Sequence, residues 1–441
     1  MTKYNFLCVD IGTSSLKAAL VSDKGQVLSF YREMFSSSDK SKISSDWIAG
    51  LQNSIYKIKR DMQLAGNGFS CDAVCISGNG PTLVSEDGTT LLWNEKLDGE
   101  IENAQSGAAG SAHDSNTGSG HDSNTGSAQL QKDIEEKFSH SLFIPRIKYF
   151  KHRYPESFNN KKIFSGPEYL IWYLTGTHIT ILPEARYEAA YWNDQALSFL
   201  GAKPEQFGRF VNPGYNCGTI TKEVSLLFGL DKNTPVIAGG PDFIVAMIGT
   251  NTLKPGKLCD CAGSSEGINL CTDRQVFAEG LRTLPSVMSG LWNLAVLMQS
   301  SGRQFVECKE NYEYEINQKI SYAEYINNCF KNKNSQGYVT MTNLAVSVKD
   351  ALDKITGCAK ENNLQIDDVM MITGGQSKSP LWIQHKTDII NYKICTTEVA
   401  DSELIGDAVL AGVALGLYKT ITEAADSMVK SSRTFVPQGE A

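Results

Sequence analysis

The sequence predicts an α/β protein of two similar domains that face each other across a ligand cleft. At 441 residues the chain is too long for one compact core, which suggests two domains or three. Short apolar strands that lead through glycines into helices recur along it, as is typical of α/β proteins. In addition, residues 258–271 repeat the pattern of residues 7–20, so the chain begins again in its second half.

The N-terminal region predicts a set of strands and one helix. Apolar runs separated by turn residues predict three strands within residues 4–34, and apolar residues at helical spacing follow over residues 46–64. Residues 72–78 form a short apolar run that predicts a buried strand. Residues 82–95 predict a hairpin around an Asp-Gly turn.

Residues 106–128 differ abruptly from their surroundings and contain the heptapeptide HDSNTGS twice, starting at His113 and His121. Nothing in this tract can build a core, so we interpret it as a flexible insertion or linker rather than a metal site. Residues 129–200 have a mostly helical pattern, which includes the amphipathic stretch GPEYLIWYLTGT with its stop at Gly176.

The internal repeat pairs two hairpins rich in glycine and hydroxyl groups. LCVDIGTSSLKAAL aligns with LCDCAGSSEGINLC, and apolar strand residues flank both loops. Asp10 aligns with Cys261, so the acidic residue occurs in the first copy only, which suggests one asymmetric ligand rather than two equal sites. The aligned loop residues are Gly12 with Gly263, Thr13 with Ser264, and Ser14 with Ser265.

Composition and charge exclude several classes of function. The net charge is −8, from 41 basic and 49 acidic residues without a long basic run, which argues against a partner that is a nucleic acid or an anionic membrane. The N-terminus lacks the apolar region of a signal peptide, and no apolar stretch is long enough to span a bilayer. The 11 cysteines are scattered without a CxxC pair, which favours free thiols in a cytoplasmic protein over a zinc site.

The bend after Asp10 is the first candidate site. Backbone N–H groups and hydroxyls of residues 12–15 could bind phosphate oxygens, and Lys17 adds positive charge. Asp10 beside such a loop suits a Mg²⁺ ion held through water and phosphate. A plain hairpin with a hydroxyl-rich turn explains the same residues equally well. No P-loop and no Rossmann fingerprint occurs in the chain.

The stretch GSSEG matches the nucleophile elbow of serine hydrolases, with Ser265 as the nucleophile. That elbow requires a following helix, whereas INLCTD predicts a strand. His385, the downstream histidine, falls in an amphipathic helical pattern. We therefore reject the hydrolase interpretation.

Two further stretches place glycine pairs between a strand and a helix. In AGGPDFIVAMIG, Asp242 follows a predicted Gly-Gly turn and could accept a proton from a substrate hydroxyl, although a helix N-cap is the common role of such a residue. In MMITGGQSKSPLWIQHKTDII, Gly374 and Gly375 could let a ligand approach the backbone closely, or simply make a tight turn.

Taken in order, these stretches resemble the FGGY family of carbohydrate kinases. DIGTSSLK is similar to the first phosphate motif of that family, and TPVIAGGPDFIVAMIGTNTLKPGKL to the segment with its catalytic aspartate. AGSSEG stands at the second phosphate loop, and ITGGQSKSPLWIQHKTDIINYKI with GDAVLAGVALGLY at the adenosine motif. EYLIWYLTGT and FVNPGYNCGTIT are similar to intervening landmarks. The resemblance spans nearly the whole chain outside residues 106–128.

The resemblance implies two ribonuclease-H-like, actin-like ATPase domains at residues 1–245 (sugar side) and 246–441 (nucleotide side), which transfer phosphate from ATP to a sugar or polyol. It implies that Asp242 is the general base, that Asp10 holds Mg²⁺ through water, and that the protein could be a homodimer. The residues implied to bind nucleotide or phosphate are Gly12, Thr13, Ser14, Lys17, Gly263, Ser264, Gln304, Gly374, Gly375, Gln376 and Ser379.

The departures from the family concern the sugar side. Where xylulokinases have SGQMHG, this chain has SGNGPT, so Asn79, Gly80 and Pro81 are expected beside the substrate together with Asp242. The family stretch Trp-x-Asp-x-Arg appears as WNEKL and lacks the arginine. These changes leave the sugar unnamed, and they motivate an alternative hypothesis, a non-catalytic relative that binds nucleotide or sugar.

Overall fold

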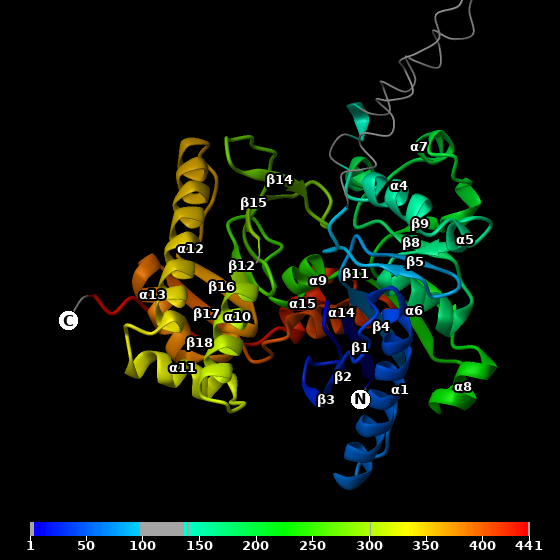
Figure 1. The fold of residues 1–441 in the computed structure, drawn as a ribbon, viewed down its shortest axis with the longest axis horizontal. Helices are drawn as coiled ribbons and strands as arrows, with labels where there is room; N and C mark the ends of the chain where they lie inside the picture. Colours follow the sequence, from blue (N-terminus) through cyan, green and yellow to red (C-terminus); the bar gives the residue numbers. More distant parts are fainter. Residues whose placement is uncertain (1–3, 98–135, 139–140, 300, 440–441) are drawn as a thin grey trace, which may run out of the picture.

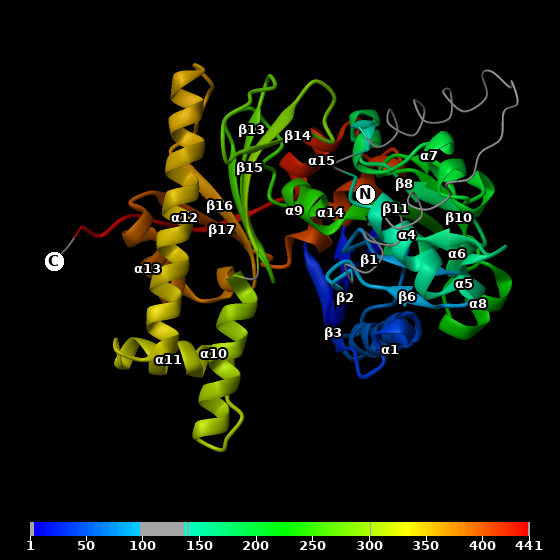
Figure 2. The ribbon, with the colours of Figure 1, turned by 45° about the horizontal axis from the view of Figure 1, so that its top comes forward.

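The computed structural model describes residues 4–97, 136–138, 141–299 and 301–439. Two large sheets lie in opposite halves of the molecule, and helices α9, α14 and α15 lie between them in both views (Figures 1 and 2). The predicted insertion at residues 106–128 lies outside the described residues.

The first sheet has six strands in the order β10-β11-β4-β1-β2-β3. The three predicted N-terminal strands and the predicted strand at residues 72–78 are all confirmed within it. Strands β1 and β2 form the antiparallel hairpin that contains the first candidate loop, and β1 also pairs in parallel with β4. The strands are β1 (Asn5–Ile11), β2 (Ser15–Ser22), β3 (Val27–Met34), β4 (Ala73–Gly78), β10 (Asn216–Thr219) and β11 (Pro235–Pro241).

The second sheet has seven strands in the order β14-β15-β13-β12-β16-β17-β18. Strands β12 and β13 form the hairpin that the repeat predicts, and the hydrolase elbow is excluded because a strand rather than a helix follows Ser265. The strands are β12 (Leu258–Ala262), β13 (Glu266–Thr272), β14 (Arg282–Pro285), β15 (Trp292–Met298), β16 (Val369–Gly374), β17 (Lys393–Thr397) and β18 (Ser431–Phe435).

The two sheets share one core arrangement. In the order β3-β2-β1-β4-β11 the first two pairs are antiparallel and the last two are parallel, and β15-β13-β12-β16-β17 repeats both the order and the directions. The prediction of two similar α/β domains from the weak repeat is therefore confirmed at the level of the sheets.

Helices cover both faces of the first sheet. Side chains alternate along β1, so Leu7, Val9 and Ile11 pack toward α1 and α6, whereas Phe6 and Cys8 pack toward α14. Asp10 follows the same alternation and faces α14. The helices of this half are α1 (Ile43–Leu64), α4 (Ile144–Arg153), α5 (Pro155–Phe158), α6 (Gly166–Thr175), α7 (Asp194–Phe199), α8 (Lys222–Phe228) and α9 (Asp242–Gly249).

Helix α14 comes late in the sequence but packs on the first sheet and on α9. The two helices touch closely: a Cβ at Gly249 would lie 1.8 Å from the Ser402 carbonyl oxygen, and one at Gly406 would lie 2.1 Å from that of Val245. A boundary at residue 245 separates the two sheets but falls inside α9, and α14 packs on the first sheet across it, so the predicted domain limits stay a prediction. The later helices are α10 (Ser301–Glu315), α11 (Tyr322–Lys331), α12 (Gln336–Glu361), α13 (Pro380–Ile390), α14 (Ser402–Ala414) and α15 (Ile421–Met428).

Smaller elements complete the first half. The predicted hairpin at residues 82–95 is present as β5 (Leu83–Ser85) and β6 (Thr90–Leu91), and α6 ends at Gly176, whose φ is +75°. The mostly helical pattern of residues 129–200 also contains the short strands β7 (Ile163–Phe164) and β8 (Ile179–Ile181), the second of which pairs with β9 (Arg209–Val211). Over the described ranges, no helix is both long and apolar enough to cross a membrane.

Candidate active site

A row of four polar residues crosses the first sheet on the face toward α14. Strand register places Asp10 on β1 opposite Lys17 on β2 and opposite Ser77 on β4, and it places Lys17 opposite Arg32 on β3. Register partners lie on the same face of a sheet, so the four side chains form one line, which we call the polar row. The first candidate loop therefore lies at the end of a strand pair that carries opposite charges.

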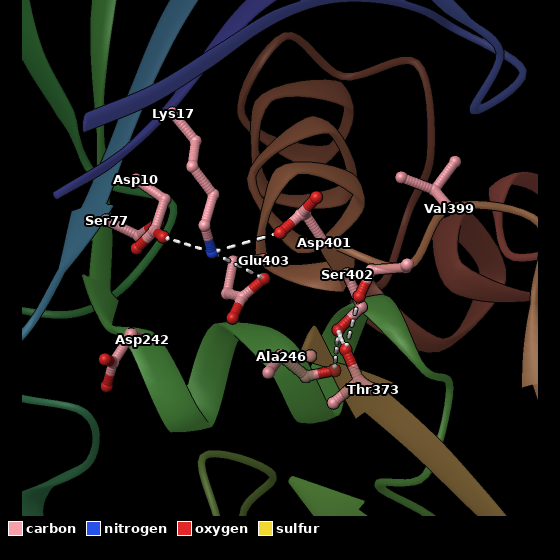
Figure 3. Close-up of polar contacts among 12 residues, drawn as sticks. Asp10, Lys17, Ser77, Asp242, Ala246, Thr373, Val399, Asp401, Ser402 and Glu403 are labelled. Atoms are coloured by element: carbon pink, nitrogen blue, oxygen red, sulfur yellow. Dashed lines mark hydrogen bonds and ion pairs between the residues drawn. The ribbon is translucent and has the colours of Figure 1, made fainter. Parts of the chain in front are cut away.

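Lys17 is surrounded by carboxylates. Its ammonium lies 3.0 Å from Asp10, 3.3 Å from Asp401 and 3.7 Å from Glu403, the last two at the start of α14 (Figure 3). Burial alone would lower the pKa of Lys17, but the charges of Asp10, Glu403 and Asp401 together raise it above its ordinary value. The lysine is therefore charged, and its charge is already shared among three acidic groups.

Asp10 is buried, yet only one of its carboxylate oxygens has a partner. Oδ2 forms the ion pair with Lys17, whereas Oδ1 is buried without a hydrogen-bond partner. An unpartnered carboxylate oxygen is a suitable ligand, directly or through water, for a hard cation such as Mg²⁺. Within the part of the chain that the structure describes, no group of three or more acidic, histidine or cysteine side chains is arranged to hold a metal by itself. The residues present therefore fit a cation that brings further ligands of its own.

Asp242 is the first residue of α9 and is half-buried. Burial raises its pKa to about 6, and the nearby negative charge of Asp10 adds to the increase. Its Oδ1 accepts a hydrogen bond of 2.7 Å from the backbone N–H of Phe243, and it makes no N-cap bond further into the helix. A carboxylate with this pKa is ionised at neutral pH and is able to take up a proton.

The glycine pair before Asp242 is not the predicted turn. Gly239 and Gly240 lie inside β11, where the pairing with β4 shifts register, and Gly240 has a φ of +146°. A Cβ at Gly239 would lie 2.7 Å from Oδ1 of Asp407 on α14. Gly239 therefore allows close packing against both β4 and α14, since a Cβ there would also lie 2.4 Å from the Ile76 carbonyl oxygen, and Gly240 supplies a positive φ within the strand; neither makes a chain reversal.

In both hairpin loops the aligned glycine donates a backbone hydrogen bond across the loop, but the acceptor in the second loop is one residue closer along the chain. The N–H of Gly12 donates to the carbonyl of Ser15 at 2.9 Å, and the N–H of Gly263 donates to that of Ser265 at 3.0 Å. The start of α10 packs against this second loop, since a Cβ at Gly302 would lie 2.1 Å from the Gly263 carbonyl oxygen. Gln304, which the resemblance implies to bind nucleotide, is exposed on the first turn of α10. The predicted loop residues Gly263 and Ser264 thus lie close to the segment of Gln304.

The predicted adenosine residues lie where β16 ends. Gly374 has a φ of +92°, and a Cβ there would lie 2.3 Å from the Ala262 carbonyl oxygen, so only glycine fits between β16 and the second loop. Gly375 opens the 3₁₀ helix η4 (Gly375–Lys378) and has free space where a Cβ would stand. Ser379 caps α13 with its hydroxyl, and Gln376 is buried. Of these four residues, Gly375 therefore leaves the most open space for a ligand.

A buried charge cluster lies beneath this turn. Lys386 on α13 contacts Asp260 at 2.8 Å and also contacts Glu266, and all three side chains are fully buried. Gln376 donates to Glu266 at 2.9 Å. Burial, and the charge of Glu266 beside it, raise the pKa of Asp260 well above its usual range. The cluster ties the second loop, the glycine turn and α13 together.

The two sequence stretches that depart from the family lie together in space. Asn79 is buried, its Oδ1 accepts from the Thr82 hydroxyl at 3.1 Å, and its Nδ2 has no partner. The Trp93 backbone N–H donates to that hydroxyl at 3.2 Å, and the Trp93 indole N–H donates to Thr13 at 3.1 Å. The expected sugar-side stretch, in which Gly80 is exposed, is thus connected to the first phosphate motif.

Sequence reasoning missed the acidic residues of α14. Asp401 and Glu403 contact Lys17, and Asp407 accepts hydrogen bonds from Ser77 at 2.9 Å and from Cys75 at 3.4 Å. The signal was available, because Asp407 stands in the otherwise apolar run GDAVLAGVALGLY, where a charged residue needs a polar partner. Its partner could not be named from the sequence, since α14 packs on a sheet formed much earlier in the chain.

Comparisons with other proteins agree with this architecture. Residues 5–249 match the N-terminal domain, and residues 336–415 the C-terminal domain, of the FGGY family of carbohydrate kinases. A xylulose kinase from Staphylococcus xylosus is 21% identical over 97% of this chain and 95% of that protein. An autoinducer-2 kinase from Enterobacter sp. (strain 638) is 22% identical over 56% of this chain, and the match spans 55% of that relative's length.

Solved structures share the fold at low sequence identity. A ligand-bound xylulose kinase from Lactobacillus acidophilus has a TM-score of 0.69 at 16% identity, with 99% of this chain and 94% of that chain covered. A glycerol kinase from Plasmodium falciparum with ADP has a TM-score of 0.71 at 14% identity and the same coverage of both chains. The predicted two-domain actin-like ATPase fold is thereby confirmed. With the N-terminal match alone spanning more than half of its length, the chain belongs to the FGGY family of carbohydrate kinases.

Proposed function

We propose that this protein is an ATP-dependent kinase that transfers the γ-phosphate to a hydroxyl of a sugar, a ketose such as a pentulose, or of a polyol. The observation that carries the proposal is Asp242, a half-buried carboxylate with a pKa of about 6 beside Asp10 at the start of α9. It stands in the chain where the resemblance expects the general base. Xylulose, glycerol and gluconate kinases among the structural neighbours support a sugar or polyol acceptor.

In the proposed reaction the acceptor hydroxyl gives its proton to Asp242 while its oxygen forms a bond to the γ-phosphorus. The bond from that phosphorus to the β-phosphate oxygen breaks, and ADP leaves. Lys17 supplies positive charge beside the first loop, where the N–H groups and hydroxyls of residues 12–14 would bind phosphate. Bound Mg²⁺, held through water by Asp10, would neutralise phosphate charge.

The remaining assignments follow the same placement. Gly263 and Ser264 would bind phosphate from the second sheet, and Asn79, Gly80 and Pro81 would line the sugar side. The adenosine would lie against the turn at residues 374–379, with Gln304 nearby. We further propose the domain limits 1–245 and 246–441, a cytoplasmic location, and a homodimer as the assembly to test.

A screen for ADP release tests the proposal directly. The full-length protein is incubated with ATP and MgCl₂ and with pentuloses, hexuloses, pentitols or glycerol, one at a time. We expect one class of acceptor to release ADP together with an equal amount of phosphorylated product. ATP binding without turnover on any acceptor would contradict the kinase assignment and would favour a non-catalytic binding protein.

A further inference from the structure

The connection between β17 and α14 joins the two halves of the molecule. The Ala400 carbonyl accepts hydrogen bonds of 3.0 Å from the Gly374 N–H and from the Thr373 hydroxyl, at the end of β16. The Ser402 hydroxyl lies 2.5 Å from that of Thr373 and donates to the Ala246 carbonyl of α9 at 3.3 Å (Figure 3). Residues 400–402 are therefore fixed both to the strand that leads into the glycine turn and to the helix that begins with Asp242.

Asp401 lies in the middle of this connection and contacts three cations. Its Oδ1 is 3.3 Å from Lys17 and 2.9 Å from Arg32, both in the polar row of the first sheet. Its Oδ2 is 2.7 Å from Lys378, the last residue of η4 in the second half. The carboxylate is buried, 8% exposed, and Lys17 is 15% exposed, so solvent screens their contact only weakly. The side chains of Arg32 and Lys378 are 39% and 42% exposed, so solvent screens their contacts with Asp401 more strongly.

The ionisation of Asp401 is consistent with this arrangement. Burial alone would raise its pKa, but the charges of Lys17, Lys378 and Arg32 lower it below its ordinary value. A buried carboxylate with good partners stays charged and holds those partners in place. The same group thus contacts Lys17, which we place beside the phosphates, and Lys378, which ends the proposed nucleotide turn.

We infer that Asp401 is a positioning residue that links the nucleotide turn, through Lys378, to the Lys17–Asp10 pair. The inference rests on the proposed function, since it takes the turn at residues 374–379 as part of the nucleotide site. Asp401 holds two lysines from opposite halves of the molecule in fixed places before ATP binds. The side chains of these two lysines then lose less conformational freedom when ATP binds.

A positioning role for Asp401 predicts that loss of its carboxylate weakens ATP binding, whereas charge repulsion alone predicts the opposite change. A carboxylate close to phosphate repels it, so its removal alone would tighten ATP binding. Loss of a positioning group weakens ATP binding, because Lys17 then keeps only Asp10 and Glu403 as acidic partners and Lys378 loses its contact with Asp401. The sign of the change separates these two roles.

The test is calorimetric titration of the full-length protein with ATP in the presence of MgCl₂. We expect Asp401→Asn to weaken ATP binding at least about ten-fold and Asp401→Glu to recover part of the loss. Arg32→Gln should weaken it roughly three-fold through Asp401, and should have no added effect in the Asp401→Asn background. Glu33→Gln is the matched control, because Glu33 lies on the same strand as Arg32 and pairs with Lys57 instead.

An ATP affinity of Asp401→Asn equal to or tighter than that of the wild type would overturn the inference, even if its melting temperature falls. Additive effects of Arg32→Gln and Asp401→Asn would also overturn it. Should Asp401→Asn fail to fold, the ATP affinities of Arg32→Gln and Lys378→Gln test the inference instead. A positioning role for Asp401 requires both substitutions to weaken ATP binding. A wild-type protein that binds no ATP would instead contradict the proposed function, and with it the basis of the inference.

Discussion

Asp10 and Lys17 are register partners on β1 and β2, and their side chains form an ion pair of 3.0 Å. The pair lies at the centre of the polar row, under the acidic start of α14. This ion pair explains the spacing of the acidic and the basic residue in the first phosphate motif. The motif places an acid and a base seven residues apart so that a hairpin brings them together on one face.

The activity should depend on the ionisation of Asp242. Its pKa is raised to about 6, mainly by burial and then by the charge of Asp10, and a general base must be deprotonated. We expect kcat/KM for the best acceptor to be constant above this pKa and to fall about ten-fold per pH unit below it. A profile that stays flat down to about pH 4, the ordinary range of an aspartate, would contradict the assignment.

Asp407 should make folding less favourable as the pH rises. Burial raises the pKa of this carboxyl group well above its usual range, and the charges of Asp10 and Glu403 raise it further. Above about pH 4 the unfolded chain releases a proton that the folded protein retains. Stability therefore falls with increasing pH by about 1.4 kcal/mol per pH unit until the folded-state pKa is reached.

The substitution Asp407→Asn isolates this effect, because asparagine can still bond Ser77 but does not ionise. We expect the variant to gain stability relative to the wild type in urea unfolding as the pH is raised from about 5 to about 8. A difference between the two proteins that does not vary with pH would show that Asp407 is ionised in the folded state.

The crossing of α9 and α14 should tolerate no side chain at Gly249. A Cβ there would lie 1.8 Å from the Ser402 carbonyl oxygen, so Gly249→Ala should destabilise the protein by roughly 1–3 kcal/mol in urea unfolding. Gly357→Ala is the matched control, because Gly357 lies on α12 with nothing within 4 Å of an added Cβ. It should raise stability by up to about 1 kcal/mol. Equal effects of both substitutions would argue against the close crossing.

The buried cluster around Lys386 should be costly to break. Lys386→Met leaves Asp260 and Glu266 buried without their cation, and we expect a loss of roughly 3–5 kcal/mol in the free energy of unfolding. Lys393→Met provides the comparison, since its pair with Asp368 is mostly exposed, and it should leave the unfolding midpoint unchanged within error. A Lys386→Met protein as stable as this control would mean that the cluster is not formed.

The sequence was sufficient to predict the strands and the repeat, because alternation and glycine positions are local signals. The hairpin at β1 and β2, the strand before Asp242 and the turn after β16 were all predicted from such signals. The Gly239-Gly240 pair predicts a turn but lies inside β11, since a glycine required for close packing against a neighbouring strand and helix, or for a positive φ, looks the same in sequence.

The contacts of Lys17 with Asp401 and Glu403, and the buried cluster around Lys386, could not be predicted. Asp401 lies 384 positions after Lys17 in the chain (401 minus 17). Their contact depends on the packing of α14 on the sheet of the first half. Lys386 lies in a helical pattern that predicts an ordinary amphipathic face, whereas the structure buries its charge against two carboxylates. Both arrangements depend on tertiary packing, which short sequence patterns do not encode.

The most direct test of the central claim is a comparison of Asp242→Asn with the wild type on the acceptor that the ADP-release screen identifies. The proposed role of Asp242 predicts that turnover falls by about 10²–10⁴-fold while the affinity for ATP, measured by calorimetry, stays within about three-fold. An Asp242→Asn protein that retains wild-type turnover would contradict the claim that this carboxylate accepts the proton.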